Sequence, residues 1–327
     1  MQLTTLAGTT LRISPICLGT AAIGHAISEE ESFALLDRFT ELGGNFVDTA
    51  RIYSDWVPGE RGRGERILGD WMRSRRIRDH LVIATKGGHP SLDSMHVPRT
   101  SEAELRSDLD ASLRVLGTDH VDLYWLHRDD PARPVEHFVD VLNALVDEGK
   151  VRTFGASNWS AARLRAAHDY AMAAGRRTFA ASQPHWCLGC QHSRPSSIPG
   201  LVLFDADAER FHKETGAAVI PYSSQAGGFF SKLALAPDQR PVGWEKSAYN
   251  TSQGLAAGKA VAELSRELGV PAGAIVLAYL WSRPFPVVPV VGCRTKAQLE
   301  ASVAAIPLRL SSDQLQRLER ASRSGLL

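Results

Sequence analysis

Eight short apolar runs recur along the chain, with longer amphipathic segments between them. Runs of this kind are typical of parallel strands that are covered on both faces. Capping boxes at Ser28/Glu31 and Ser101/Glu104 predict helix starts, and glycines at 43–44, 117 and 149 predict helix ends. The predicted strands are Ile16–Gly19, Phe46–Ala50, Leu81–Thr85, Val121–Leu126, Arg152–Ser157, Phe179–Gln183, Ala217–Tyr222 and Val287–Val291.

Eight strand–helix units without an obvious linker favour an α/β fold, a single (β/α)8 TIM barrel that spans residues 1–327 as one domain. A doubly wound sheet would usually carry Gly-x-Gly-x-x-Gly after its first strand, and the segment Gly19–Gly24 lacks that spacing. Leu3–Leu6 and Leu11–Ile13 predict an N-terminal β-hairpin. A C-terminal helix is expected after Leu308, opened by Ser311 and Gln314.

Composition argues against two classes of partner. The 37 basic and 36 acidic residues are evenly spread, which gives no electrostatic footprint for nucleic acid or an anionic membrane. The N-terminus lacks a signal-peptide pattern, and no run approaches the roughly 18 apolar residues of a membrane span. We therefore expect a cytoplasmic protein with neither nucleic-acid nor membrane partners.

A cysteine pair raises the question of a metal. Cys187 and Cys190, with His185 and His192, supply two thiolates and two imidazoles, which is a possible zinc ligand set. All four lie within eight residues, without the distant second pair that zinc folds use to join segments. The sequence therefore favours a loop that carries two thiols, and it predicts no metal site.

Ionisable residues follow three of the predicted strands. Asp48, Lys86 and His127 each end an apolar run, and Tyr53 follows Asp48 by five residues. Active residues of barrels lie at the C-terminal ends of strands, so these four side chains are expected to meet. A tyrosine beside ionisable partners is able to donate a proton in catalysis. The other polar groups at strand ends are Gly19–Thr20, Ser157–Asn158, Gln183 and Tyr222–Ser223.

In order and spacing, these motifs resemble those of the aldo-keto reductases. The resemblance rests on Gly19-Thr20, Asp48-Thr-Ala-x-x-Tyr53, Ala84-Thr-Lys86, Leu126-His127, Gly155-Ala-Ser-Asn158, Gln183, Tyr222-Ser-Ser and Gly292-Cys-Arg294. It implies a barrel that binds NAD(P)H across its mouth, without a Rossmann domain, and reduces an aldehyde or ketone.

The resemblance also assigns roles. Tyr53 would donate the proton, Lys86 would lower the tyrosine pKa, and Asp48 would hold Lys86 charged and oriented. His127 would donate to the substrate oxygen or share the tyrosine's proton. Ser157, Asn158 and Gln183 would hold the nicotinamide carboxamide, and Tyr222 would stack on its ring. The remaining positions implied for the cofactor site are Gly19, Thr20, Asp48, Ser223, Ser224, Gln225 and Gly227, with Gly292, Arg294 and Gln298 toward the adenosine end.

The chain departs from the family pattern near its adenosine end. Many relatives have Gln-Leu-x-Glu-Asn there, and this chain has Ala301 and Ser302 in the last two positions. Arg294 and Lys296 suit a 2′-phosphate, because cations, and a planar guanidinium above all, match its oxygens. We therefore expect NADPH rather than NADH.

The substrate is a small carbonyl compound whose identity the sequence leaves open. Trp56, Trp159 and Trp186 are candidates to wall the pocket, although they would equally pack loops against the rim. A polar set on the same loops suggests a hydrophilic, sugar-like substrate: His89, Asp93, His96, Arg128, Asp129, Asp130 and Arg133. Two other functions remain open, an NADPH-binding regulatory protein and a Schiff-base aldolase using Lys86. A neighbouring Asp48 would hold Lys86 charged, which disfavours the aldolase.

Overall fold

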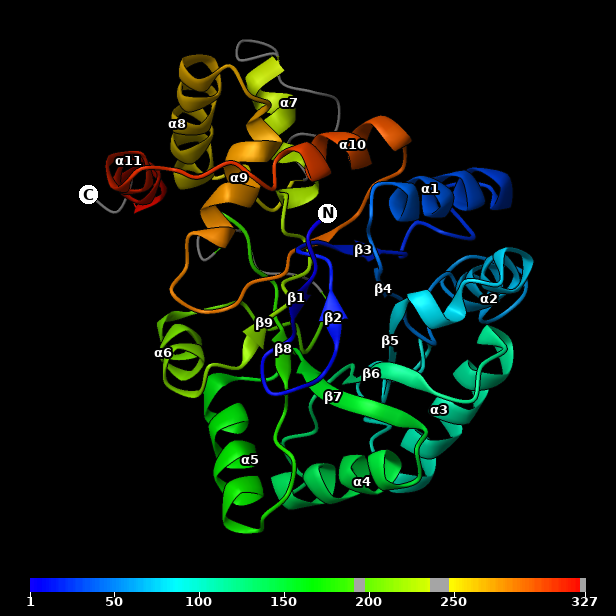
Figure 1. Ribbon diagram of the computed structural model, residues 1–327. Helices are drawn as coiled ribbons and strands as arrows, with labels where there is room; N and C mark the ends of the chain where they lie inside the picture. Colours follow the sequence, from blue (N-terminus) through cyan, green and yellow to red (C-terminus); the bar gives the residue numbers. More distant parts are fainter. Residues whose placement is uncertain (191–197, 236–246, 324–327) are drawn as a thin grey trace.

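The architecture is a parallel β-barrel wrapped by helices, as the alternation of apolar and amphipathic segments predicts (Figure 1). The computed structural model describes residues 1–190, 198–235 and 247–323. The barrel strands are β3 (Cys17–Gly19), β4 (Phe46–Asp48), β5 (Val82–Gly87), β6 (Val121–Leu126), β7 (Val151–Ser157), β8 (Ala181–Gln183), β9 (Ala218–Val219) and β10 (Val290–Val291). Each of the eight predicted runs contains, or largely overlaps, one of these strands.

Parallel pairing runs in sequence order from β3 to β9, and β10 pairs with β3. The remaining gap is closed beside Val219. Its backbone N–H donates to the Pro286 carbonyl at 2.9 Å, and its carbonyl accepts from the Val288 N–H at 2.9 Å. These bonds join β9 to the segment before β10, so the sheet curls into the predicted (β/α)8 barrel.

Helices cover the outside of the strands (Figure 1). Both predicted capping boxes are present, at Ser28/Glu31 and Ser101/Glu104, and Gly117 ends α3 in the left-handed conformation with φ 69°. The helices are α1 (Glu29–Glu41), α2 (Arg63–Arg75), α3 (Glu102–Leu116), α4 (Val135–Asp147), α5 (Ala161–Ala173), α6 (Ala206–Thr215), α7 (Phe229–Leu235), α8 (Ser252–Leu268), α9 (Ala272–Trp281), α10 (Lys296–Ala304) and α11 (Ser312–Arg323). Within the described ranges, no helix combines the length and apolarity needed to cross a membrane.

A hairpin closes one end of the barrel. β1 (Thr4–Thr5) pairs antiparallel with β2 (Arg12–Ile13), which confirms the predicted N-terminal hairpin. Its apolar residues Leu6, Leu11 and Ile13 are buried in one cluster with Phe46 and Val82, which begin their strands. The hairpin therefore covers the N-terminal end of the strands and leaves the C-terminal end as the mouth.

Candidate active site

Three of the four predicted titratable groups are in direct contact at the barrel mouth. Lys86, on β5, donates from Nζ to Asp48 Oδ2 at 2.5 Å, to the Thr49 carbonyl at 2.7 Å and to the Tyr53 hydroxyl at 3.1 Å. Asp48 is the last residue of β4, and Tyr53 follows it in the loop. One ammonium therefore links a carboxylate on one side to a phenol on the other.

Asp48 is held by donors from two further strands. Its Oδ1 accepts from Trp125 Nε1, on β6, and from Gln183 Nε2, on β8, each at 3.0 Å. The side chains of Lys86 and Asp48 are 2% and 3% exposed, so water does not compete for these bonds. This arrangement fixes the position of the carboxylate and, through it, the position of the ammonium.

The charge state of Lys86 follows from its surroundings. Burial alone lowers the pKa of Lys86, but the charge of Asp48 and the proximity of Tyr53 outweigh it and leave that pKa raised. Lys86 is therefore an ammonium at neutral pH. A Schiff-base nucleophile needs the opposite shift, which argues against an aldolase.

Tyr53 differs from expectation in one respect. Burial raises its pKa, and the lowering influence of the nearby Lys86 ammonium does not overcome that effect, so the pKa stays above its usual value. The sequence predicted the lowering effect of Lys86 but not the larger opposing effect of burial. At neutral pH the Tyr53 phenol retains its proton, the form that a proton donor requires.

His127 follows β6 and faces the same space. Its ring centroid lies 6.2 Å from that of Tyr53 and 4.7 Å from that of His89. Burial, followed by the charges of His89, Arg128 and Lys86, holds the pKa of His127 well below its usual value. The imidazole is therefore neutral, and its Nδ1 makes no hydrogen bond with any of the described residues.

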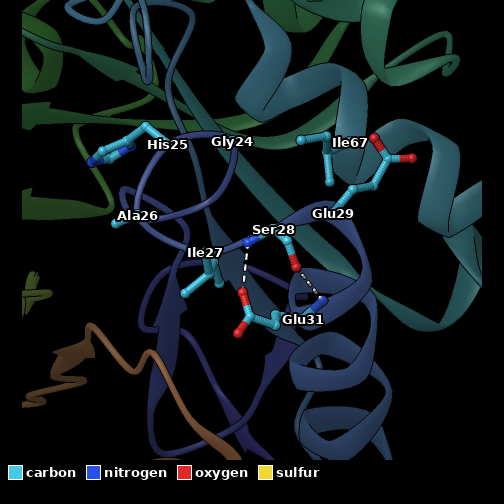
Figure 2. A pocket seen from close by; sticks show the side chains of 8 residues that line it. All are labelled: Gly24, His25, Ala26, Ile27, Ser28, Glu29, Glu31 and Ile67. Atoms are coloured by element: carbon cyan, nitrogen blue, oxygen red, sulfur yellow. Dashed lines mark hydrogen bonds between the residues drawn. The ribbon is translucent and has the colours of Figure 1, made fainter.

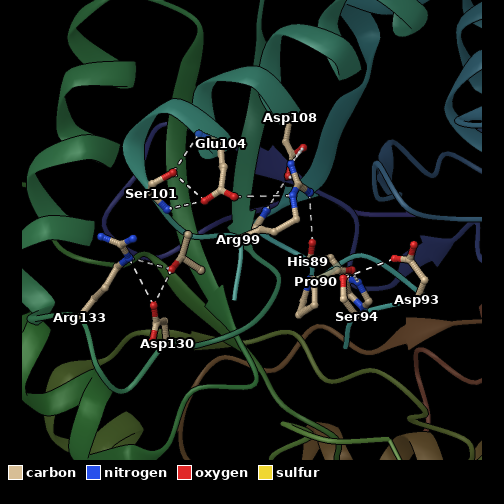
Figure 3. A network of polar contacts seen from close by, with 12 residues as sticks. His89, Pro90, Asp93, Ser94, Arg99, Ser101, Glu104, Asp108, Asp130 and Arg133 are labelled. Atoms are coloured by element: carbon tan, nitrogen blue, oxygen red, sulfur yellow. Dashed lines mark hydrogen bonds and ion pairs between the residues drawn. The ribbon is translucent and has the colours of Figure 1, made fainter. Parts of the chain in front are cut away.

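The loop after β5 holds His89 against His127. Arg99 Nη1 donates to the His89 carbonyl at 3.2 Å, and the same guanidinium pairs with Asp108 at 3.0 Å (Figure 3). His89 Nδ1 lies 2.7 Å from the Pro90 carbonyl, and burial lowers the pKa of His89 to about 4. Two neutral imidazoles thus stand side by side at the mouth.

The residues predicted to hold the nicotinamide form one network at the ends of β7, β8 and β9. Ser157 Oγ donates to the Gln183 carbonyl at 2.9 Å, and Asn158 Nδ2 donates to the His127 carbonyl at 3.3 Å. The Tyr222 hydroxyl donates to Asn158 Oδ1 at 2.8 Å. The structure brings these residues together and connects them to His127.

The predicted phosphate loop follows this network. Ser223 and Gly227 are exposed, whereas the buried Ser224 donates from Oγ to the Val290 carbonyl at 2.6 Å. Gln225 Nε2 reaches Ser302 Oγ at 3.4 Å, which joins the loop to α10. Gly227 has φ 60° and open space around its Cα, a geometry that suits close approach of a phosphate.

The predicted adenosine end is more exposed. Gly292, Arg294 and Lys296 are exposed, and Gln298 Oε1 accepts from the Arg294 backbone N–H at 2.8 Å. Ser302, the departure noted in the sequence, is buried and donates to the Gln298 carbonyl at 2.9 Å. Two cations are therefore available to a ligand here, while Gln298 and Ser302 already have partners within the protein.

Two of the predicted cofactor residues contribute mainly to the fold. Thr20 Oγ1 donates to the Asp48 carbonyl at 3.0 Å, and a Cβ on Gly19 would meet Val290 Cγ1 at 2.7 Å. Both residues thus keep β3 close to its neighbours β4 and β10. Their position beside Asp48 places them at the rim of the mouth.

Comparison with known proteins identifies the family. A sequence model described as "Aldo/keto reductase family" matches residues 15–323. The chain belongs to the aldo/keto reductase family. Norsolorinic acid reductase of Emericella nidulans is 32% identical over 331 positions, covering 97% of this chain and 80% of that protein. An aryl-alcohol dehydrogenase of Pestalotiopsis microspora is 29% identical, covering 95% and 79%. Norsolorinic acid reductase B of Aspergillus parasiticus is 30% identical, covering 95% and 81%.

These matches make the protein an oxidoreductase and bear out the resemblance seen in its motifs. Of the three tryptophans predicted to wall the pocket of this reductase, one lies at the mouth. Trp56 is 45% exposed and its ring centroid is 6.0 Å from that of Tyr53. Trp159 is buried against Phe138 and Phe179, and Trp186 is stacked on Phe204 with centroids 4.1 Å apart. Trp159 and Trp186 therefore pack the core beneath the loops.

The cysteine pair of the reductase also packs in the core. Cys187 and Cys190 are fully buried, in an apolar cluster that includes Trp186 and Leu188. Burial raises the pKa of the Cys187 thiol well above its usual value. His192, the fourth potential ligand, lies outside the described residues. Among the described residues, no group of three or more His, Cys, Asp or Glu side chains is arranged to hold a metal.

A separate hollow of about 330 Å³ lies at the start of α1 (Figure 2). It is lined by the 24–29 segment, Glu31 and Ile67, and it contains none of the four predicted catalytic residues. Figure 2 shows Ser28 and Glu31 bonded to each other across the first helical turn, so the free N–H groups at this helix start are partly satisfied. His25, on its rim, contacts Trp56 with ring centroids 5.2 Å apart, which places the hollow next to the mouth.

Three contacts at the site had no clear signal in the sequence. Trp125 is packed in the barrel core, and it also donates to Asp48. Gln183 was expected to face the cofactor, and its amide nitrogen is bonded to the same carboxylate. His89 belonged to a general polar set, and only the course of the loop after β5 places it against His127.

Proposed function

We propose that this reductase uses NADPH to reduce an aldehyde or ketone to an alcohol, with Tyr53 as the proton donor. The observation that carries the proposal is the Lys86 ammonium bonded to both Asp48 and the Tyr53 hydroxyl. A reduced nicotinamide would supply the hydride that adds to the carbonyl carbon. The electron pair of the C=O bond then moves to oxygen, which takes the proton from Tyr53.

Each residue of the group has a role that its geometry supports. The phenolate left on Tyr53 is stabilised by Lys86 Nζ, 3.1 Å away. Asp48 keeps that ammonium charged and oriented. His127 is neutral and borders the same space, so it is suited to donate a hydrogen bond to the substrate oxygen without adding charge.

The residues present fit a nicotinamide dinucleotide. Tyr222 is half-buried at the mouth, with His185 stacked on it at 5.3 Å, so its ring offers a supported surface for the nicotinamide. Ser157, Asn158 and Gln183, at the ends of the neighbouring strands, would hold the carboxamide. The loop from Ser223 to Gly227 would hold the pyrophosphate, and Arg294 and Lys296 would meet the 2′-phosphate of NADPH.

Two substrate classes are distinguished by specific features. The relatives named aryl-alcohol dehydrogenases and the exposed Trp56 ring beside Tyr53 favour an aromatic carbonyl compound. The polar loop residues would favour a sugar-like one, but Asp129 and Asp130 are engaged in ion pairs with Arg163 and Arg133. We therefore propose an aromatic aldehyde or ketone as substrate. One domain over residues 1–327, a cytoplasmic location and the absence of a nucleic-acid partner remain predictions.

The test replaces Tyr53 with phenylalanine and follows NADPH consumption with a panel of aromatic aldehydes and sugars. Loss of a general acid should lower kcat roughly 10²- to 10⁴-fold, with NADPH affinity by fluorescence titration unchanged. Tyr170→Phe is the matched control, because that hydroxyl bonds Asp140 on the outer helices. Retained activity in Tyr53→Phe would make His127 the first alternative donor. NADPH binding without turnover of any carbonyl would favour a regulatory protein instead.

A further inference from the structure

Arg128 is a buried cation that pairs with none of the carboxylates in the described ranges. It follows His127 in the loop between β6 and α4, and its side chain belongs to a residue only 9% exposed. Nη1 donates to the His127 carbonyl at 3.1 Å, whereas Nε has no partner in the described parts of the chain. No ion pair joins its guanidinium to any of the described carboxylates.

The two acidic residues that follow Arg128 pair with other arginines. Asp129 forms an ion pair with Arg163 at 2.9 Å. Asp130 accepts from Thr100 Oγ1 at 3.0 Å and pairs with Arg133 at 3.3 Å (Figure 3). Both carboxylates that follow Arg128 in the sequence are therefore bonded to other groups, although either would be close enough along the chain to neutralise it.

An arrangement of this kind is costly for the folded protein. Removing a guanidinium from water without a partner destabilises the fold, and arginine keeps its charge even where burial lowers its pKa, as it does for Arg128. A cation that is retained at such a cost is suited to bind an anion that arrives from outside. A planar guanidinium is the side chain that best matches the oxygens of a carboxylate or phosphate.

The position of Arg128 connects it to the reaction site. It lines a small cavity of about 90 Å³ next to His89, together with the apolar Pro90, Met95 and Pro98 and the polar Thr100 and Asp129, whose carboxylate is paired with Arg163. After burial, which is the largest influence on each group, the charge of Arg128 is among the factors that lower the pKa of both Tyr53 and His127. The guanidinium therefore acts on the same groups that would meet the carbonyl oxygen.

We propose that Arg128 binds an oxyanion, a carboxylate or a phosphate ester, carried by the carbonyl substrate of this reductase. The inference rests on the proposed carbonyl reduction and specifies its substrate: an aromatic carbonyl compound with a negatively charged group on the side of the ring remote from the reacting carbon. The apolar cavity wall would contact the ring, and Arg128 would fix its orientation.

The experiment compares 4-carboxybenzaldehyde with benzaldehyde in the full-length protein with NADPH, before and after Arg128→Met. We expect the wild type to prefer the carboxylate. The ratio of the two kcat/KM values should fall roughly 10- to 100-fold in Arg128→Met, the size of a lost charge-assisted hydrogen bond. Arg128→Lys should retain part of the preference. Arg317→Met, which removes an arginine paired with Glu267 on the outer helices, should leave the ratio as it is in the wild type.

The unfolding temperature gives a second measurement, which separates anion binding by Arg128 from a purely structural role. Because no described carboxylate pairs with Arg128, Arg128→Met should unfold at the same or a higher temperature than the wild type, whereas Arg163→Met, which leaves Asp129 without this partner, should unfold at a lower one. A substrate ratio unchanged by Arg128→Met would overturn the proposal. Equal losses on both aldehydes would also overturn it, since they would indicate a role in cofactor binding or folding.

A binding measurement separates this inference from the proposed reaction. Calorimetric titration with benzoate and with phenyl phosphate, in the presence of NADPH, would show which oxyanion is preferred. Binding that is lost in Arg128→Met supports the anion site even if neither aldehyde is reduced, in which case the proposed reaction fails alone. If neither anion binds the wild type, the proposed anion site is wrong.

Discussion

Glu65 should make the stability of this reductase fall as the pH rises toward neutrality. The side chain, on α2, is fully buried and accepts a hydrogen bond from Thr85 Oγ1 on β5. Burial raises the pKa of Glu65 to about 7, against smaller lowering effects of the Thr85 and Ser112 hydroxyls and of Arg51 and Lys86. Below its unfolded pKa of about 4.3, Glu65 is protonated in both states and causes no penalty.

The magnitude follows from linkage. Each pKa unit corresponds to about 1.4 kcal/mol, so ionised Glu65 destabilises the folded protein by about 3 kcal/mol above pH 7. Its stabilising contribution is fully present below the unfolded pKa and disappears as the pH rises through about 7. Glu65→Gln, which cannot ionise, should therefore gain about 2 to 3 kcal/mol relative to the wild type between pH 5 and pH 8.

Urea unfolding at several pH values measures this difference directly, with the free energy of unfolding compared between the two proteins at each pH. Glu136→Gln is the matched control, because Glu136 is exposed and forms no ion pair with the described residues. Its difference from the wild type should not vary with pH. If the Glu65→Gln and wild-type curves run parallel, Glu65 is ionised without cost in the folded protein, and the charges of Arg51 and Lys86 outweigh its burial.

Three other predictions concern the site. Lys86→Met should abolish carbonyl reduction and lower the free energy of unfolding by about 3 to 5 kcal/mol, because it leaves the Asp48 carboxylate buried without its cation; kinetics and urea unfolding check both effects. The double variant Arg294→Ala/Lys296→Ala should weaken NADPH binding more than NADH binding in fluorescence titrations, because only NADPH carries the 2′-phosphate. Equal weakening would show that these two cations do not bind that phosphate. Replacing Cys187 and Cys190 by serine should lower the free energy of unfolding, because a polar hydroxyl then replaces each thiol in an apolar cluster, and should leave NADPH binding unchanged with no metal lost by elemental analysis; stoichiometric zinc in the wild type would contradict this.

The barrel was predictable because its signals are local. The strands lie in continuous apolar runs, and α1 and α3 begin at capping residues that satisfy their own backbone, so no distant contact is needed to recognise them. The hairpin was equally visible as two apolar segments around Ala7-Gly8-Thr9-Thr10. The strand limits shifted by a few residues, as at β9, where only Ala218 and Val219 form the ladder of the longer predicted run.

The side-chain contacts were less predictable because they depend on loop paths. Trp159 and Trp186 both follow a strand end closely, yet both rings turn into the core, whereas Trp56 remains at the surface. Tryptophan, with a large apolar ring and one polar N–H group, stands at all three positions. The sequence does not indicate whether a loop turns that ring into the core or toward the surface. The surroundings of Tyr53 were hidden for the same reason, so the sequence predicted the lowering effect of Lys86 on its pKa but not the larger raising effect of burial.

The proposed proton-transfer group and the proposed substrate-binding side chains lie on different parts of the barrel. Asp48 receives its three donors from Lys86 on β5, Trp125 on β6 and Gln183 on β8, so the curvature of the sheet itself brings them to one carboxylate. Loop changes would leave this arrangement in place. Arg128 and Trp56, in contrast, lie on loops, where a substitution alters what is bound without moving the ammonium beside Tyr53. A change of substrate in this reductase should therefore need loop substitutions alone, with Asp48, Lys86 and Tyr53 kept.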